Sequence, residues 1–139
     1  MKYFFLLSLI TVLAHNSTAT PNLIVIMADD LGYADVGFNG SQDIPTPHID
    51  RIASEGVKCT SAYTSYSVCG PSRAGFLTGS YQQRFGFERN PLWLPKSTTT
   101  GLSLQEKTIA ESLNQVGYHC GIIGKWHMGE QSDEKRPGF

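Results

Sequence analysis

The sequence of 139 residues has no apolar run long enough to span a membrane, no basic cluster and no internal repeat. Its N-terminal apolar run, from Tyr3 to Ala14, is shorter than the roughly 20 residues that a spanning helix needs. The formal net charge of −1, without lysines and arginines clustered among aromatic residues, gives no electrostatic basis for binding nucleic acid. At 40% hydrophobic and 17% charged residues, the composition is that of an ordinary globular domain.

The N-terminus has the pattern of a secretory signal peptide. Lys2 precedes the apolar run, and the small residues Ser17 to Ala19 follow it at the position of a cleavage site. We therefore expect residues 1–19 to be a signal peptide; the alternative is an uncleaved membrane anchor. The mature chain would begin near Thr20 and be exported to the periplasm or cell exterior, or to the lysosome in a eukaryote. This segment is the protein's only expected contact with a membrane.

Cysteine is scarce, with three residues in the chain. In an oxidising compartment an even number would indicate disulfides, and three leaves one over. Cys59 and Cys120 lie in strand-like segments. They could form a disulfide with each other, or each could be a buried free thiol, and the sequence is consistent with both. The third, Cys69, stands directly before a Gly-Pro-Ser-Arg sequence.

Apolar segments alternate with helical patterns along the chain. Continuous or strand-like apolar runs predict β-strands at residues 22–27, 57–63 and 118–123. Capping residues and periodicity predict helices at residues 47–56, 69–79 and 108–116. Residues 80–101 have no clear period and are expected to form a long surface loop. This alternation predicts an α/β fold with a largely parallel sheet.

Two adjacent carboxylates, Asp29 and Asp30, follow the first predicted strand. Oxygen ligands of this kind suit a hard divalent cation such as calcium or magnesium. An isolated Asp-Asp pair is more often a solvated loop or a helix cap. Their place directly after a buried strand favours a metal site, since two crowded like charges are stabilised by a counter-ion.

Cys69 follows the second predicted strand, at the start of a helix. A thiol there would be favoured as thiolate by the helix dipole, so a cysteine nucleophile is one interpretation and an inert thiol another. Arg73, about one turn later, can direct its guanidinium back toward residue 69. The helix N-terminus itself suits a tetrahedral oxyanion.

Lys125 and His127 follow the third predicted strand and are separated by one residue. In an extended segment they would project to the same side, giving a cation for an anionic substrate and a group that transfers protons. Because ligands bind beyond the carboxyl ends of parallel strands, we expect all three strand ends to contribute to one site.

The chain resembles the sulfatase family, within the alkaline-phosphatase-like superfamily. Cys69–Arg73 has the Cys-x-Pro-Ser-Arg pattern of the sulfatase signature, which is highly specific. Three further stretches match in family order and are weak alone but strong together. The four matching stretches are residues 21–33, 46–50, 69–79 and 117–129.

The resemblance implies a three-layer α/β/α sheet of the alkaline-phosphatase type, with residues 20–139 the N-terminal portion of a sulfatase catalytic domain. It implies hydrolysis of sulfate esters of a small molecule or a glycan. Cys69 would be oxidised to formylglycine, or 3-oxoalanine, by a formylglycine-generating enzyme. One calcium ion would be held by Asp29, Asp30 and the formylglycine at residue 69.

The resemblance also implies a mechanism. One hydroxyl of the hydrated aldehyde attacks sulfur and expels the alcohol, after which the diol collapses and releases sulfate. Carried over to this chain, Arg73 and Lys125 would hold and polarise the diol, and His127 would assist its collapse. The metal would offset charge on the sulfate oxygens.

Several family residues have no counterpart in the sequence. An Asp-Asn pair of metal ligands, with a further His and Lys at the sulfate, lies downstream of the last matching stretch in the family. The chain is therefore expected to be an N-terminal fragment with an incomplete sheet, inactive alone. Two alternatives stay open for the function: a formylglycine-dependent phosphate or phosphonate ester hydrolase, and a non-catalytic binding module of the same fold.

Overall fold

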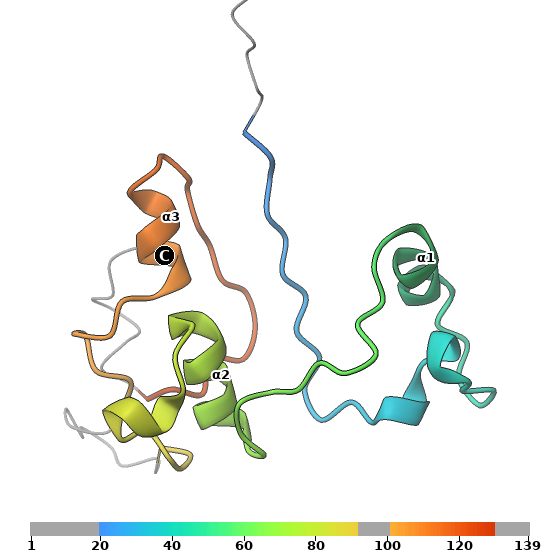
Figure 1. The fold of residues 1–139 in the computed structure, drawn as a ribbon, viewed down its shortest axis with the longest axis horizontal. Helices are drawn as coiled ribbons and strands as arrows, with labels where there is room; N and C mark the ends of the chain where they lie inside the picture. The colour runs from blue at the N-terminus through green and yellow to red at the C-terminus, as the bar shows by residue number, and fades with distance from the viewer. Residues whose placement is uncertain (1–19, 92–100, 130–139) are drawn as a thin grey trace, which may run out of the picture. The chain divides into compact units, whose positions relative to one another are not determined.

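The computed structural model describes residues 20–91 and 101–129 (Figure 1). The chain divides into two compact units, one ending at Asp30 and the other beginning at Leu31. The predicted signal peptide, residues 1–19, lies outside the described residues. Among the helices that the structure does describe, none combines the length and the apolar character required to cross a membrane.

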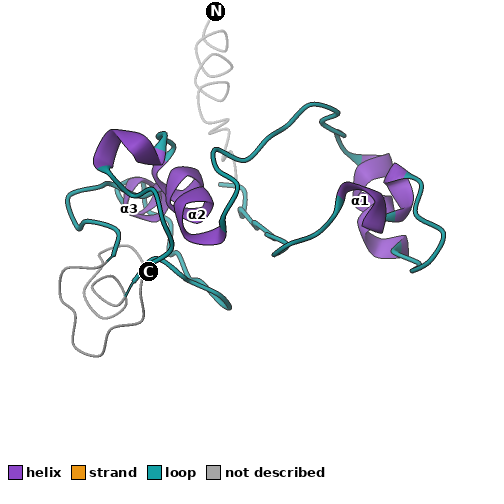
Figure 2. Ribbon diagram, turned by 90° about the horizontal axis from the view of Figure 1, so that it is seen from below, coloured by secondary structure: helices purple, strands orange, loops and turns teal. Residues whose placement is uncertain are grey.

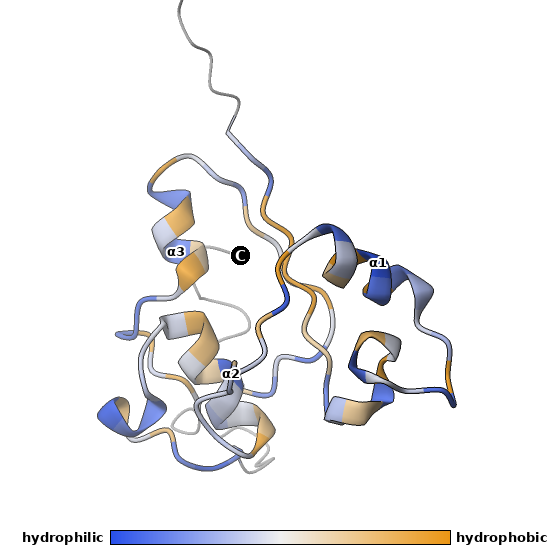
Figure 3. Ribbon diagram, turned by 45° about the vertical axis from the view of Figure 1, so that its right-hand side comes forward, coloured by the Kyte–Doolittle hydropathy of each residue, from blue (hydrophilic) through white to orange (hydrophobic). Residues whose placement is uncertain are grey.

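The described part of the first unit, residues 20–30, is irregular chain (Figure 1). Its run of apolar side chains, Leu23 to Met27, appears as an orange stretch in Figure 3. These side chains are exposed, with Ile24 and Ile26 each 83% accessible. The unit ends at Asp30, whose φ of 54° lies in the left-handed region that non-glycine residues seldom adopt.

The predicted β-strands are not present in the described part of the chain, where Figure 2 draws helices and loops alone. Residues 22–27, 57–63 and 118–123 are irregular, and Val57 and Ile123 are 91% and 103% exposed. A strand exists through hydrogen bonds to a neighbouring strand, and these segments have no ladder partner among the residues described. The three strand assignments are therefore corrected, and the three-layer α/β/α sheet stays a prediction.

Two short 3-10 helices and a longer helix open the second unit: η1 (Tyr33–Asp35), η2 (Gly37–Asn39) and α1 (Pro47–Glu55). Thr46 precedes Pro47 at the N-cap position, but its hydroxyl does not cap the helix. It accepts a hydrogen bond from the Gly37 amide at 2.8 Å and donates one to the Asp50 carboxylate at 3.0 Å. The same carboxylate accepts from the Phe38 amide at 2.8 Å, so these bonds join η2 to α1.

The helix α2 (Cys69–Thr78) begins at the cysteine, as the sequence predicts. Pro71 lies in its first turn, where the missing N–H costs nothing. Gly79 ends it in the left-handed conformation, with φ of 63°. The helix η3 (Gln82–Phe85) follows and contacts α2.

The helix α3 (Ile109–Asn114) is shorter than the predicted 108–116. Thr108 and Glu111 form a capping box, in which Glu111 Oε2 accepts from the Thr108 amide at 2.7 Å. Gly117, with φ of 90°, turns the chain after the helix. α3 contacts α2, and the two lie side by side in Figures 1 and 2.

The core of the second unit lies beside α2. Ala74, Leu102 and Met128 are fully buried, and burial of a side chain such as Leu or Met contributes about 1.5–3 kcal/mol. Gly101 and Gly129 form an antiparallel bridge, and the Leu102 amide donates to the Met128 carbonyl at 2.8 Å. The segment that follows residue 124 is thereby fixed against α2. Around this core pack the partly buried side chains of Leu77, Phe85, Phe87 and Trp126.

Candidate active site

Cys69 is the first residue of α2 and is half-buried. Val68 before it has extended backbone, and its carbonyl accepts the first helical hydrogen bond from the Ser72 amide at 3.2 Å. The Cys69 side chain therefore stands at the N-terminal end of a helix that is anchored by the buried Ala74. None of the three cysteines forms a disulfide; Cys59 is exposed, and Cys120 lies with its sulfur 3.8 Å from the Ala110 carbonyl.

Lys125 brings a cation directly to the cysteine. Its Nζ donates a hydrogen bond to Cys69 Sγ at 3.5 Å, across 56 residues of sequence. The sequence predicted that these two residues would share a site. The structure brings their side chains into contact, and their catalytic roles stay a prediction. An ammonium group in this position stabilises negative charge on the side chain of residue 69.

Arg73 forms a hydrogen bond with the backbone of Lys125. One guanidinium nitrogen donates to the Lys125 carbonyl at 2.6 Å, so the helix that carries Cys69 also holds the backbone of Lys125. Arg73 lies about one turn after Cys69, as the sequence indicated. This bond links the side chain of an α2 residue to the main chain of Lys125 and so ties the helix to that segment.

His127 differs from the prediction in its backbone. Its φ is 56°, so the segment is not extended at this residue and the argument that Lys125 and His127 project alike from a strand is wrong. Such conformations cost about 1–3 kcal/mol and concentrate at functional sites. The Nδ1 atom of the ring is buried and has no hydrogen-bond partner among the described residues. A buried nitrogen of this kind calls for an explanation in chemistry or in a ligand.

Two core side chains hold the segment that carries Lys125 and His127. Trp126 packs against the cluster around Ala74, and Met128 is fully buried in it. The Trp126 indole N–H also donates to the Gly129 carbonyl at 3.2 Å. Polar residues therefore alternate with anchored apolar ones over residues 125–128, and this alternation fixes where the two polar side chains emerge.

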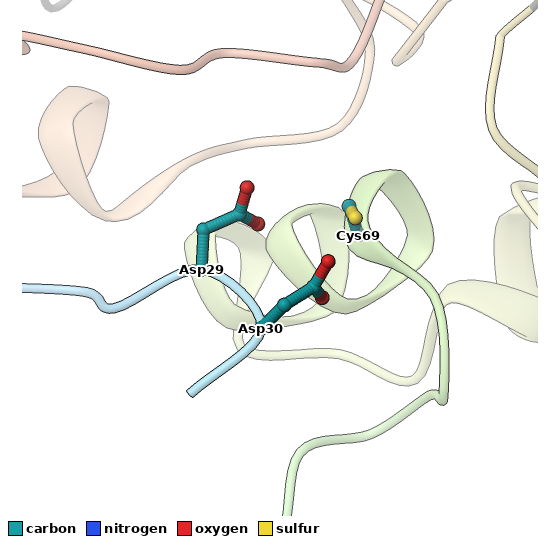
Figure 4. A group of neighbouring side chains, drawn as sticks. All are labelled: Asp29, Asp30 and Cys69. Atoms are coloured by element: carbon teal, nitrogen blue, oxygen red, sulfur yellow. The ribbon is translucent and has the colours of Figure 1, made fainter. Parts of the chain in front are cut away.

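Asp29 and Asp30 end the first unit, whereas Cys69 belongs to the second. Figure 4 shows the three side chains, the carboxylates on the N-terminal segment and the thiol on the first turn of α2. Each offers one ligand atom, and both carboxylates are exposed. Two hard oxygen donors in adjacent residues have the chemistry that calcium prefers. Their use as one ligand set with residue 69 stays a prediction.

One residue of this region was not predicted from the sequence. Asn90 Oδ1 accepts a hydrogen bond at 2.7 Å from the amide of Gly70, the residue after the cysteine. Asn90 lies in residues 80–101, for which a surface loop was predicted. That segment also contains the fully buried Gln82, whose amide donates to the Ser65 carbonyl at 3.2 Å. An asparagine before a proline predicts a turn, and no sequence signal joins it to residue 70.

The comparisons with known proteins agree on one family. The family model described as "Sulfatase" matches residues 21–139. The rat steryl-sulfatase is 46% identical over 112 residues, covering 78% of this chain and 19% of that protein. Human arylsulfatase A is 45% identical over 109 residues, covering 78% of this chain and 21% of that protein.

The chain is also similar to solved structures. The crystal structure of Ps i-CgsB is 47% identical to this chain, with a TM-score of 0.70 over 76% of this chain and 23% of the other. In the crystal structure of the complex of Ps i-CgsB with k-i-k-neocarrahexaose, the protein chain is 43% identical to this one. The TM-score is 0.72, and the match covers 80% of this chain and 25% of the other. The chain thus spans about a fifth of the length of the curated relatives.

Proposed function

Since this chain belongs to the sulfatase family, we propose that the protein hydrolyses sulfate esters at residue 69, after Cys69 is converted to formylglycine. The observation that carries the proposal is the 3.5 Å contact from Lys125 Nζ to Cys69 Sγ. It places a cation at the one side chain that the signature singles out. The hydrated aldehyde would supply the oxygen nucleophile.

Three side chains have separate roles in this proposal. Lys125 stabilises negative charge on the side chain of residue 69, through the contact described above. Arg73 holds the Lys125 backbone and so fixes the distance between the ammonium group and residue 69. His127, whose buried Nδ1 has no partner in the part of the chain that the structure describes, transfers the proton that allows residue 69 to return to its starting state.

A calcium ion fits the donor chemistry of the N-terminal unit. Asp29 and Asp30 supply two carboxylates, and residue 69 would complete the part of the shell that this chain contributes. When bound, calcium would act as a Lewis acid on the sulfate oxygens. In the sulfatase family, the further metal ligands, an Asp-Asn pair, lie downstream of the stretch that corresponds to residues 117–129.

The reaction class is tested by comparing an aryl sulfate with an aryl phosphate as substrates of the full-length protein. We expect the sulfate to be hydrolysed with the higher kcat/KM. Faster hydrolysis of the phosphate would instead support the formylglycine-dependent phosphate or phosphonate ester hydrolase. Turnover of neither, with residue 69 found as an unmodified thiol, would support a binding module of the same fold.

The substrate class follows from what the relatives act on or bind. One relative is a steryl-sulfatase, and another was solved with an oligosaccharide, k-i-k-neocarrahexaose. We propose a sulfated small molecule or a sulfated oligosaccharide as substrate. Release of sulfate from each class, measured under identical conditions, distinguishes them.

Maturation and location complete the proposal. Residues 1–19 would direct export and be removed, so the active protein would reach the periplasm, the cell exterior or the lysosome. A formylglycine-generating enzyme would be the partner that oxidises Cys69. N-terminal sequencing of the secreted protein tests the cleavage, with a first residue near Thr20 expected and an intact Met1 as the contrary result.

Replacing Lys125 with alanine should lower kcat/KM about 10²-fold, because a hydrogen bond to a charged group is worth about 1.5–3 kcal/mol. Steady-state kinetics on an aryl sulfate measure the loss. Lys107→Ala is the matched control, since its Nζ contacts Gln115 at 2.7 Å and not residue 69. Equal activity of the two variants would refute the role of Lys125.

Residues 20–139 alone should show no sulfatase turnover. The chain spans about a fifth of the length of its curated relatives, and the candidate metal ligands among the described residues are Asp29, Asp30 and Cys69. Aryl sulfate hydrolysis by this purified segment, compared with its Cys69→Ala variant, measures the prediction. Turnover above that of the variant would mean that the site needs no further residues.

A further inference from the structure

We propose that Asn90 is a positioning residue that caps the N-terminus of α2 and holds residue 69 in place for reaction. This inference rests on the proposed function, because the reaction at residue 69 is what the positioning serves. Its structural part, the cap itself, can be tested without any enzyme assay.

The first turn of α2 has no cap of its own. Helices leave their first backbone N–H groups without partners inside the helix, and a Ser, Thr, Asp or Asn at the N-cap normally accepts one of them. The N-cap residue here is Val68, whose side chain makes no capping hydrogen bond. Pro71 has no N–H, and the Ser72 amide already donates to the Val68 carbonyl. The Gly70 N–H therefore needs an acceptor from elsewhere.

Asn90 provides this acceptor from 20 residues away. Its Oδ1 lies 2.7 Å from the Gly70 nitrogen, in a part-buried hydrogen bond. Asparagine is among the strongest N-capping residues, and here it acts through space instead of from the adjacent position. The bond is short and joins the amide directly after Cys69 to a separate segment of the chain.

Glycine at position 70 leaves room for this arrangement. A Cβ atom there would lie 2.9 Å from Asn90 Oδ1, 3.3 Å from Pro91 Cδ and 2.8 Å from the His127 carbonyl oxygen. These approaches show that three segments meet at one residue: the start of α2, the Asn90–Pro91 segment and the backbone of His127. Asn90 thus fixes the residue next to Cys69 at the point where the His127 segment also packs.

The geometry gives Asn90 a specific effect on catalysis. Loss of its Oδ1 frees the Gly70 amide and loosens the turn that orients residue 69 relative to Lys125 and His127. Misplacement of a reacting group by about 1 Å costs on the order of 10² in rate. We expect Asn90→Ala to lower kcat about 10²-fold and to leave KM within about twofold, because Asn90 contacts the helix backbone and not the substrate.

Three variants of the full-length protein test the proposal. Asn90→Ala removes the acceptor, Asn90→Asp keeps it and adds a charge that a helix N-terminus favours, and Asn114→Ala changes an exposed asparagine at the end of α3. Amide hydrogen exchange is measured over the first turn of α2 and over α3, together with kinetics on an aryl sulfate.

The expected result is faster exchange in N90A, by about fivefold or more and confined to the first turn of α2, with kcat restored toward the parent in N90D and unaffected in N114A. Exchange in N90A that is unchanged, or that rises equally in α2 and α3, would overturn the cap. Unchanged kcat in N90A, where the parent is active, would overturn the positioning role. A parent protein without turnover contradicts the proposed function instead, and the exchange data still decide whether Asn90 caps the helix.

Discussion

Replacing Cys69 with alanine should abolish sulfate ester hydrolysis, lowering kcat by about 10⁶-fold, the scale observed when a hydrolase loses its nucleophile. Residue 69 would carry the only group that bonds to sulfur in the proposed reaction, and alanine can form neither a thiol nor an aldehyde. The neighbouring contacts of Lys125 and Arg73 then have no reacting group to serve. Steady-state hydrolysis of an aryl sulfate by the full-length protein measures the loss.

Cys59→Ala is the matched control for this variant. Cys59 is an exposed thiol without a disulfide, so its removal should leave turnover at the parental level. A thermal unfolding curve for each variant checks that α2 persists, since Cys69 is half-buried at its start. Activity in C69A above about one hundredth of the parental value would contradict the assignment of residue 69 as nucleophile.

Replacing both Asp29 and Asp30 with asparagine should remove calcium-dependent activity. A bound metal ion stabilises a transition state by several kcal/mol, which corresponds to about 10³-fold in rate. Asparagine has nearly the same shape as aspartate but no charge, so the variant tests the charge of the carboxylates. Titration with calcium after treatment with a chelator measures both the affinity for the ion and the recovered turnover.

Asp43→Asn serves as the control, since Asp43 is also exposed and lies in a loop outside the proposed site. We expect it to respond to the chelator and to calcium as the parent does. The double variant should need far more calcium for half-maximal recovery, or show no recovery. An unchanged calcium response in the double variant would mean that these carboxylates are not ligands.

The helices of this chain can be predicted from the sequence because the residues that begin and end each helix lie within or next to it. Pro47 and Pro71 stand in first turns, and Gly79 ends α2 in the left-handed conformation. For α3, the capping box of Thr108 and Glu111 lies within four residues. Each such signal acts within one helical turn, so no knowledge of the tertiary structure is needed to find it.

The predicted strands show the opposite case. Residues 23–27 are apolar, as expected of a covered strand, yet Ile24 and Ile26 are each 83% exposed. A strand requires partner strands that can lie far away in the sequence, so local residues do not identify them. The apolar pattern predicts that these segments become buried, but it does not identify the strands that would pair with them. No such strands are present among the described residues.

The site lies between these two cases. The signature and the strand-end positions predicted that Cys69 and Lys125 belong together, and their 3.5 Å contact agrees. The left-handed backbone of His127 and the reach of Asn90 to Gly70 were not predictable, because both depend on how distant segments pack. Arg73 was expected near residue 69, but its bond to the Lys125 carbonyl arises from the same packing.

Mass spectrometry of the peptide that contains residue 69 tests the central claim most directly. The full-length protein is produced together with a formylglycine-generating enzyme and assayed for aryl sulfate hydrolysis before digestion. We predict that residue 69 has the mass of formylglycine and is trapped by a carbonyl reagent, and that trapping removes the activity. An intact thiol at residue 69 in a preparation that still hydrolyses aryl sulfates would contradict it.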